Sequence, residues 1–328
     1  MDGPLLECVP NVSEGRDQQF LDDLADLISL QPDVKLLHVD RGYDANRTVF
    51  TFVGSPSGVV DAAFAMMSFC QEKLDMRSHE GSHSRIGAVD VCPLVPVSGI
   101  SMAETVEWAM KLGQRVGREL RLPVYMYESA AQRAERKNLA TIRKGEYEGL
   151  AEKMKKDNWQ PDFGPVAPSA KFGATVIGAR SFLVAFNINL RADTPLKVAK
   201  RIAGILRESG IKGQRGLIKG LKAIGWHQPE FGCCQVSTNV VEPQLVNLAH
   251  LYRSCTRLAR ASGYDTAGSE LIGLIPETYL LAAGRVVCPS SSSDRAIACG
   301  IDYLGLNALE KFDVNERVLE YLLCFYLI

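Results

Sequence analysis

The chain has 328 residues, of which 46% are hydrophobic and 23% are charged, and its formal net charge is −1. This length and composition allow a large buried core and make two subdomains the first expectation. A nearly neutral chain is poorly suited to nucleic acid, because the phosphate backbone selects strongly basic surfaces. We therefore expect a globular protein without a nucleic-acid partner.

Targeting signals and cysteine usage indicate the compartment. Residues 1–10 have neither a positively charged start nor a long apolar run, so we expect no secretory signal. No apolar run is long enough for a transmembrane helix, and we expect no membrane partner. The nine cysteines lack Cys-x-x-Cys spacing, which is typical of reduced thiols in the cytosol. These features predict a cytoplasmic protein.

The first half of the chain alternates between strands and helices. Apolar, β-branched runs predict strands, and apolar positions three or four residues apart predict helices. Strands are expected at 6–12, 34–40, 47–54, 88–97 and 123–127, and helices at 17–30, 59–74 and 101–121, followed by a charged helical stretch to residue 156. Residues 40–46 are expected to form a turn, and Ser101 with Glu104 a capping box.

A proline-rich segment divides the chain. Residues 157–171 contain Pro161, Pro165 and Pro168, which argues against regular structure and marks the expected boundary between the halves. Beyond it, strands are predicted at 174–177, 182–190, 222–227 and 235–240, and helices at 195–208, capped by Thr194, and at 242–261. This order predicts an α+β fold of two sheet-plus-helix subdomains, which we place at residues 1–181 and 182–328.

The stretch His79-Glu80-Gly81-Ser82-His83 spells a zinc-protease motif, which needs both histidines on one face of a helix. The glycines and serines around it favour a loop instead. A third ligand is also needed, and the capping box is the better explanation of Glu104. A loop histidine can act as a general acid and base near neutral pH, although most histidines are merely solvated or hydrogen-bonded.

Short sequence motifs, in the same order along residues 6–323, resemble those of a known protein family. They include Glu7-Cys8-Val9-Pro10-Asn11 within 7–15, and the strings 46–54, 87–93, 145–148, 161–165, 173–176, 185–190, 235–239 and 268–276. On these strings the chain resembles the formiminotransferase domain. That domain occurs as a free-standing glutamate formimidoyltransferase and as the amino-terminal half of formimidoyltransferase-cyclodeaminase.

The resemblance implies a fold and a reaction. The two sheets would face one another across a tunnel for folate, with the helices outside, and the protein would be a homodimer. A formimino group would pass between N-formimino-L-glutamate and tetrahydrofolate, as in histidine degradation, without a metal. A separate or fused cyclodeaminase would be a partner.

The resemblance also assigns residues. His83 matches the family's catalytic histidine and is expected to act as general acid and base. Asp40 is expected to orient the imidazole or contact the pterin, unless it only forms a turn. Arg47 and Arg85 are candidates for binding carboxylates. The folate-binding segment maps onto Gly164, Pro165, Val166, Ala167, Pro168, Ser169, Ala170, Lys171, Phe172 and Gly173. Phe172 is expected to stack on a ring, and an inter-subdomain linker is the alternative reading of these residues.

The chain departs from the family at the histidine string. Where the family carries His-Lys-Gly-Glu-His-Pro-Arg-Met-Gly, residues 79–87 read His-Glu-Gly-Ser-His-Ser-Arg-Ile-Gly. Glu80 and Ser82 change the charge beside the expected base. Residues 166–172 form a segment of the same length as in the family, but their amino acids differ. A catalytically inactive folate-binding or interaction paralogue is therefore the second hypothesis.

Overall fold

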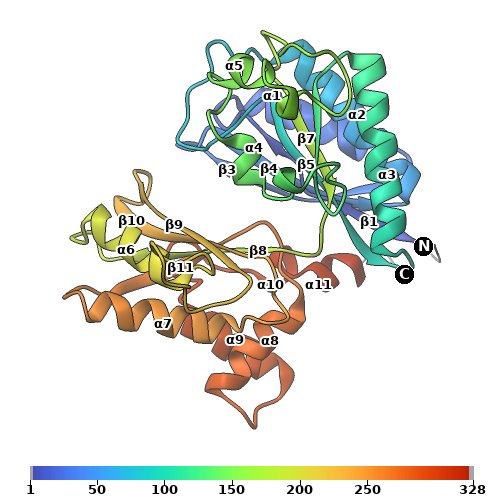
Figure 1. Cartoon of the computed structure of the whole chain (residues 1–328). Helices are drawn as coiled ribbons and strands as arrows, with labels where there is room; N and C mark the ends of the chain where they lie inside the picture. Colours follow the sequence, from blue (N-terminus) through green and yellow to red (C-terminus); the bar gives the residue numbers. More distant parts are fainter. Residues whose placement is uncertain (1–2, 325–328) are drawn as a thin grey trace. The chain divides into compact units, whose positions relative to one another are not determined.

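The computed structural model describes residues 3–324. The chain divides into two compact units, Met1–Ser181 and Phe182–Ile328. Each unit contains one sheet and its own helices (Figure 1). The predicted α+β class is confirmed, whereas the facing of the two sheets stays a prediction.

The first unit is built on a seven-stranded sheet. The sheet runs in the order β1-β4-β2-β5-β7-β6, with β3 paired to β4. Pairs are antiparallel except for β5 with β7 and β7 with β6. The strands are β1 Leu5–Cys8, β2 Asn11–Val12, β3 Val34–Gly42, β4 Arg47–Gly54, β5 Val89–Ser98, β6 Val124–Glu128 and β7 Thr175–Ala179.

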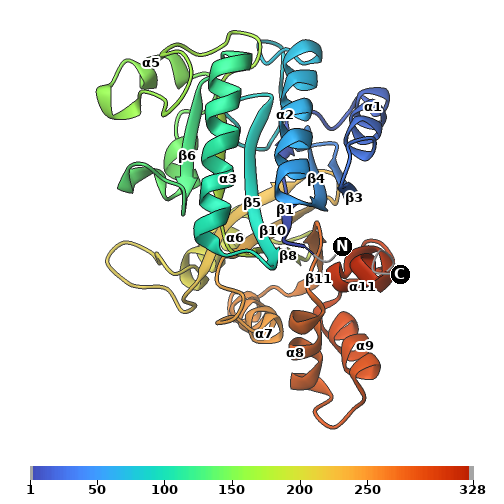
Figure 2. The ribbon, with the colours of Figure 1, turned by 90° about the vertical axis from the view of Figure 1, so that its right-hand side faces the viewer.

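Three long helices cover one face of this sheet. They are α1 Gln18–Ser29, α2 Pro56–Lys73 and α3 Met102–Arg115, the last continued by a π-helical turn over Val116–Leu120. Figure 2 shows α2 and α3 side by side over the sheet, running roughly along β5 and β6. The opposite face carries a smaller apolar cluster in which the short helices α4 Leu139–Arg143 and α5 Leu150–Met154 pack on β5, β6 and β7.

Capping residues fix where these helices begin. The Asp17 carboxylate accepts a hydrogen bond from the Phe20 backbone N–H, and Ser55 does the same for Gly58 at the start of α2. The predicted capping box of Ser101 and Glu104 is present in both directions. Each cap satisfies backbone donors that the first turn of a helix leaves unpaired.

Two strands differ from their predicted limits. The predicted strand 6–12 is split into β1 and β2 because Pro10 has no N–H for the ladder, although both strands keep the same register on β4. β3 continues to Gly42, so Asp40 lies inside a strand and the turn begins after it. The turn-forming interpretation of Asp40 is therefore wrong.

The segment between β6 and β7 also differs. The charged stretch to residue 156 holds only short helices, including the 3₁₀ turn Ala134–Arg136, and a second 3₁₀ turn, Asp157–Trp159, follows it. The proline-rich residues 157–171 are not a linker between the units, because β7 follows them and joins the first sheet. The Asp162 carboxylate anchors the segment there by an ion pair with the buried Arg136 at 2.6 Å.

The second unit has a four-stranded antiparallel sheet in the order β11-β8-β10-β9. Its strands are β8 Val184–Leu190, β9 Leu221–Gln228, β10 Cys233–Val240 and β11 Thr266–Ile272. Its helices are α6 Leu196–Leu206, α7 Leu248–Arg260, α8 Glu277–Val287, α9 Ser293–Leu304, α10 Val314–Arg317 and α11 Leu319–Cys324. Phe186, Ile188 and Val236 face the helical side, and the other side carries a polar network centred on Gln235.

Three predictions for this unit are corrected. Thr194 makes no capping hydrogen bond, and α6 begins after Pro195. The helix expected from residue 242 begins at Leu248, because Asn247 caps it and Pro243 precedes it in irregular backbone. Cys288 and Cys299 form a disulfide between α8 and α9, so the cysteines are not all reduced. The other six cysteines of residues 3–323 are free and buried.

Among residues 3–324, none of the helices combines the length and apolar character needed to cross a bilayer.

Candidate functional site

The histidine motif lies in an irregular loop, residues 74–88, that joins α2 to β5. The predicted loop is confirmed, and the helical geometry that a zinc protease needs is absent from it. Within the described part of the chain, no group of three or more His, Cys, Asp or Glu side chains is arranged to hold a metal ion. We call residues 74–88 the histidine loop.

Asn46 anchors the histidine loop to the start of β4. Its side chain donates to the Glu80 carbonyl at 2.8 Å and accepts from the Gly15 N–H at 2.9 Å. Asn46 has a φ of 46°, a left-handed conformation that asparagine tolerates better than most residues. The loop is thereby tied to two segments that lie far from it in sequence.

Both ring nitrogens of His79 are engaged. The Nε of Arg85 donates to His79 Nδ1 at 3.2 Å, and His79 Nε2 lies 2.9 Å from the Asn46 carbonyl oxygen. These partners assign the neutral tautomer with its proton on Nε2. Burial lowers the pKa of His79, opposed by the hydrogen bond to Asn46. His79 is thus a structural histidine that holds the loop.

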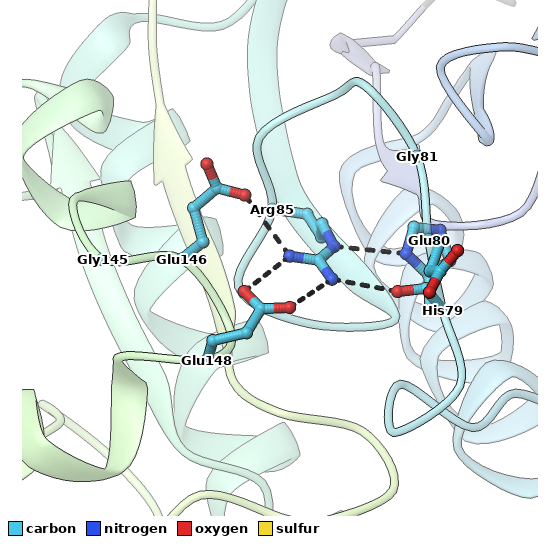
Figure 3. A pocket seen from close by; sticks show the side chains of 7 residues that line it. All are labelled: His79, Glu80, Gly81, Arg85, Gly145, Glu146 and Glu148. Atoms are coloured by element: carbon cyan, nitrogen blue, oxygen red, sulfur yellow. Dashed lines mark hydrogen bonds and ion pairs between the residues drawn. The ribbon is translucent and has the colours of Figure 1, made fainter.

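Arg85 is the centre of an ion-pair cluster. Its guanidinium donates to both Glu148 oxygens, at 2.9 and 2.7 Å, and to Glu146 at 3.3 Å (Figure 3). The hydrogen bonds that Arg85 donates to Glu148 raise the pKa of Arg85. A cavity of about 550 Å³ is lined by these residues together with His79, Glu80, Gly81 and Gly145. Because its own chain occupies the guanidinium, Arg85 is a weaker candidate for binding a substrate carboxylate.

His83 has a different environment. Its side chain is half-buried, and its Nδ1 atom is buried without a hydrogen-bond partner among the described residues. Burial lowers the pKa of His83 well below its ordinary value, and the charges of Arg47 and Arg143 lower it further. The imidazole is therefore neutral at pH 7. A buried, unpartnered ring nitrogen is unusual, and a catalytic role is one recognised reason for it.

A buried ion pair lies beneath the loop. Asp90, on β5, is fully buried; its Oδ1 accepts from the Ile86 N–H at 2.9 Å, and its Oδ2 accepts from Arg143 Nε at 2.9 Å. This pair was not predicted from the sequence, and neither were Asn46, Glu146 and Glu148 as contacts of the loop. A charged residue inside the apolar run 88–97 was the available signal, because aspartate is almost never fully buried unless it is paired.

Asp40 and Arg47 lie on the sheet face opposite the three long helices. Asp40 is directly across from Val49, which is in turn across from Asn11 on β2. His38 Nε2 lies 3.7 Å from the Asp40 carboxylate, and Arg47 donates to Asn11 at 3.4 Å. The pairing therefore groups these polar side chains on one face.

The predicted folate segment, 164–173, ends beside the histidine loop. Gly173 pairs with Gly87 in an isolated bridge, and Ala88 N–H donates to the Phe172 carbonyl at 2.8 Å. Tyr147 joins the two segments, because its N–H donates to the Arg85 carbonyl and its hydroxyl to that of Ala170. The Phe172 ring is fully buried in the apolar core and does not face a cavity, contrary to the expected stacking role.

Comparison with known proteins identifies two family models along the chain. The formiminotransferase domain, N-terminal subdomain, matches residues 5–180, and the formiminotransferase domain matches residues 185–324. Together the two matches account for most of both compact units.

Similar proteins extend over nearly the whole chain. Formimidoyltransferase-cyclodeaminase of Rattus norvegicus is 44% identical over 324 residues, covering 97% of this chain and 60% of the rat protein. Glutamate formimidoyltransferase of Streptococcus pyogenes serotype M1 is 40% identical over 277 residues, covering 84% of this chain and 91% of that protein. The Thermoplasma acidophilum protein of the same name is 37% identical over 318 residues, covering 96% and 97%. The chain belongs to the formiminotransferase family.

Proposed function

We propose that this chain is a glutamate formimidoyltransferase, moving a formimino group between N-formimino-L-glutamate and tetrahydrofolate. The observation that carries the proposal is the neutral His83, held in a fixed loop with a buried ring nitrogen that has no partner among the described residues. Relatives named glutamate formimidoyltransferase match most of the chain and support the same reaction.

The reaction needs a proton carrier near neutral pH. An amine nitrogen bonds to the amidine carbon, and the bond from that carbon to the departing nitrogen breaks. The attacking nitrogen must lose a proton and the departing nitrogen must gain one. His83 in its neutral form accepts the first proton and returns it to the leaving nitrogen, so one side chain serves as base and then acid.

Other residues take supporting roles in the proposal. Asp40, held in β3, would orient the His83 imidazole or contact the pterin, and Arg47 would bind a carboxylate of glutamate or of the folate tail. Residues 164–173 would contact the folate through their backbone, with Val166 and Ala167 exposed. Gly164 and Gly173 both have φ of 83°, which lets the segment turn tightly against Leu122 and Ile86.

The proposal also covers the subdomains, the oligomeric state and a cyclodeaminase partner. The two compact units would be the two formiminotransferase subdomains, forming a cytoplasmic homodimer without a metal. The chain spans about 60% of the length of its animal relatives, whose name includes a cyclodeaminase. A cyclodeaminase, fused or separate, would consume the formimino-folate product.

The competing hypothesis is a folate-binding paralogue without activity. It rests on Glu80, which replaces the family's lysine and adds a carboxylate to a cavity already lined by Glu146 and Glu148. A spectrophotometric assay with tetrahydrofolate and N-formimino-L-glutamate separates the two. The wild type, His83→Ala and His79→Ala are compared, each with and without a chelator.

We expect His83→Ala to lower kcat roughly 100- to 10,000-fold, the usual contribution of a general acid–base group. His79→Ala should lose less, because His79 positions the loop and transfers no proton. The chelator should change nothing. Folate binding by a wild type without turnover would refute the transferase and support the paralogue.

A further inference from the structure

Two buried ion pairs in the first unit share one geometry. In the first, Asp90 accepts from a backbone N–H with one oxygen and from Arg143 with the other. In the second, Asp162 accepts from the Met126 N–H at 2.8 Å and pairs with Arg136 at 2.6 Å. The two pairs differ in the backbone N–H that the aspartate accepts from. The Ile86 N–H belongs to the histidine loop, whereas the Met126 N–H belongs to β6.

The Asp90 pair is also connected to the Arg85 cluster. The Arg143 carbonyl accepts from the Glu146 N–H at 2.7 Å, and Glu146 is one of the two carboxylates that hold Arg85. The loop is therefore held at two successive residues, Arg85 by its side chain and Ile86 by its backbone N–H. Both contacts connect to Arg143, at the end of α4, since Glu146 and Asp90 each bond to it.

Arg143 also contributes to the charge around His83. Four groups place positive or titratable charge near this ring: Arg47 from β4, Arg143 from α4, and His79 and Arg85 from the loop itself. Arg85 is shielded by two glutamates and His79 is neutral. Burial is the largest cause of the low pKa of His83, and among the neighbouring charges those of Arg47 and Arg143 lower it most.

We propose that Asp90 and Arg143 are positioning residues for His83, which fix the backbone of the histidine loop at Ile86 and keep a guanidinium close to the imidazole. The proposal rests on the transfer reaction assigned to His83 above. Neither residue is required to touch substrate. Their effect passes through the loop backbone and through charge.

The test uses neutral and charge-conserving variants of the full chain. Asp90→Asn with Arg143→Gln replaces the ion pair by two amides that keep an acceptor for the Ile86 N–H. Arg143→Lys keeps the charge but loses the planar, forked contact. Asp162→Asn with Arg136→Gln is the matched control, because it removes a pair with the same kinds of contact that does not touch the histidine loop.

The first readout is an NMR titration of the histidine rings, which needs no turnover. The chain has five histidines, and the His83 signal is assigned by its loss in His83→Gln. We expect Asp90→Asn/Arg143→Gln to move the His83 titration to higher pH, while the control pair leaves it unchanged. Arg143→Lys should titrate like the wild type.

The second readout is turnover. We expect kcat of Asp90→Asn/Arg143→Gln to fall roughly 10- to 100-fold with little change in KM, because a loop displaced by about 1 Å loses reactive geometry. The acid limb of the pH–rate profile should move in the same direction as the titration. A wild type without turnover would count against the transfer reaction, and the titration alone would then judge the pair.

Three outcomes would overturn the proposal. One is an unchanged His83 titration in Asp90→Asn/Arg143→Gln. Another is an equal shift in the control pair, which would reduce the effect to lost stability. If the double variant does not fold, Arg143→Lys decides: His83 titrating as in the wild type with reduced kcat supports the proposal, and unchanged kcat contradicts it.

Discussion

Gly173 offers a direct test of whether the predicted folate segment and the histidine loop depend on one another. Gly173 has a φ of 83°, and a Cβ built on it would lie 2.2 Å from the Ile86 carbonyl oxygen and 2.9 Å from Gly87 Cα. Both atoms belong to the histidine loop, and neither is the end of a flexible side chain. Gly173→Ala must therefore displace the loop backbone or the segment itself.

Two costs add up in Gly173→Ala. The left-handed conformation costs a residue with a Cβ roughly 1–2 kcal/mol, and overpacking against fixed backbone costs roughly 1–3 kcal/mol more. The free energy of unfolding of the first unit should fall by roughly 2–5 kcal/mol. For a domain of this size that corresponds to a fall in Tm of roughly 4–20 °C.

Gly145→Ala is the matched control for stability. Gly145 also has a positive φ, 92°, but its nearest neighbour would be Gly149 Cα at an ordinary 3.6 Å. The control should therefore show only the conformational cost of roughly 1–2 kcal/mol. Scanning calorimetry of both variants measures the difference. Equal losses in the two would refute the argument from close approach, since the shared φ would then explain everything.

Two further predictions concern stability. Burial raises the pKa of Glu7 to about 7, opposed by the charge of Arg180. Between about pH 4.5 and pH 7 the folded state therefore keeps a proton that the unfolded state has lost. The free energy of unfolding should fall as the pH rises through this window. Glu7→Gln should remove this dependence of stability on pH, which is worth up to about 3 kcal/mol between pH 4 and pH 8. Urea titrations at several pH values measure it, and the same dependence in both proteins would contradict the prediction. The Cys288–Cys299 bond closes a loop with a sequence separation of 11, for which loop closure gives about 3 kcal/mol. Cys288→Ser should lower the Tm by about as much as a reductant lowers the Tm of the wild type. A wild-type Tm that does not change with reductant would count against a stabilising role of the disulfide.

Local rules of sequence explain most of the fold. The α1 helix buries Phe20, Leu24 and Ile28 at helical spacing, and its cap at Asp17 is where the pattern places it. Errors occur where tertiary contacts override local preference. β7 could be predicted as a strand, but its parallel pairing with β5 and β6 depends on partners far away in sequence. That pairing is why the proline-rich segment 157–171 belongs inside the first unit.

The candidate site was less predictable than the fold. Motif position singled out His83, yet its low pKa comes from burial in the folded chain and from Arg47 and Arg143, which lie 36 and 60 residues away along the chain. The roles of His79 and Arg85 depend on contacts with Asn46, Glu146 and Glu148, and no local pattern links these positions. Motif spacing finds a functional histidine more readily than it finds the residues that set its protonation state.

The substituted positions of the histidine loop bear on whether the chain is active. Position 80 contacts the rest of the unit through its carbonyl, which accepts from Asn46. Position 82 contacts it through its N–H, which donates to the Asp44 carbonyl, and the Ser82 hydroxyl donates to the same oxygen at 3.3 Å. Any residue other than proline at position 82 can make these backbone contacts, and both side chains are exposed. Glu80 and Ser82 therefore leave the anchors of the loop intact. Glu80 lines the cavity beside Arg85 and changes its charge, so this substitution should alter which ligand binds there more than it alters the position of His83.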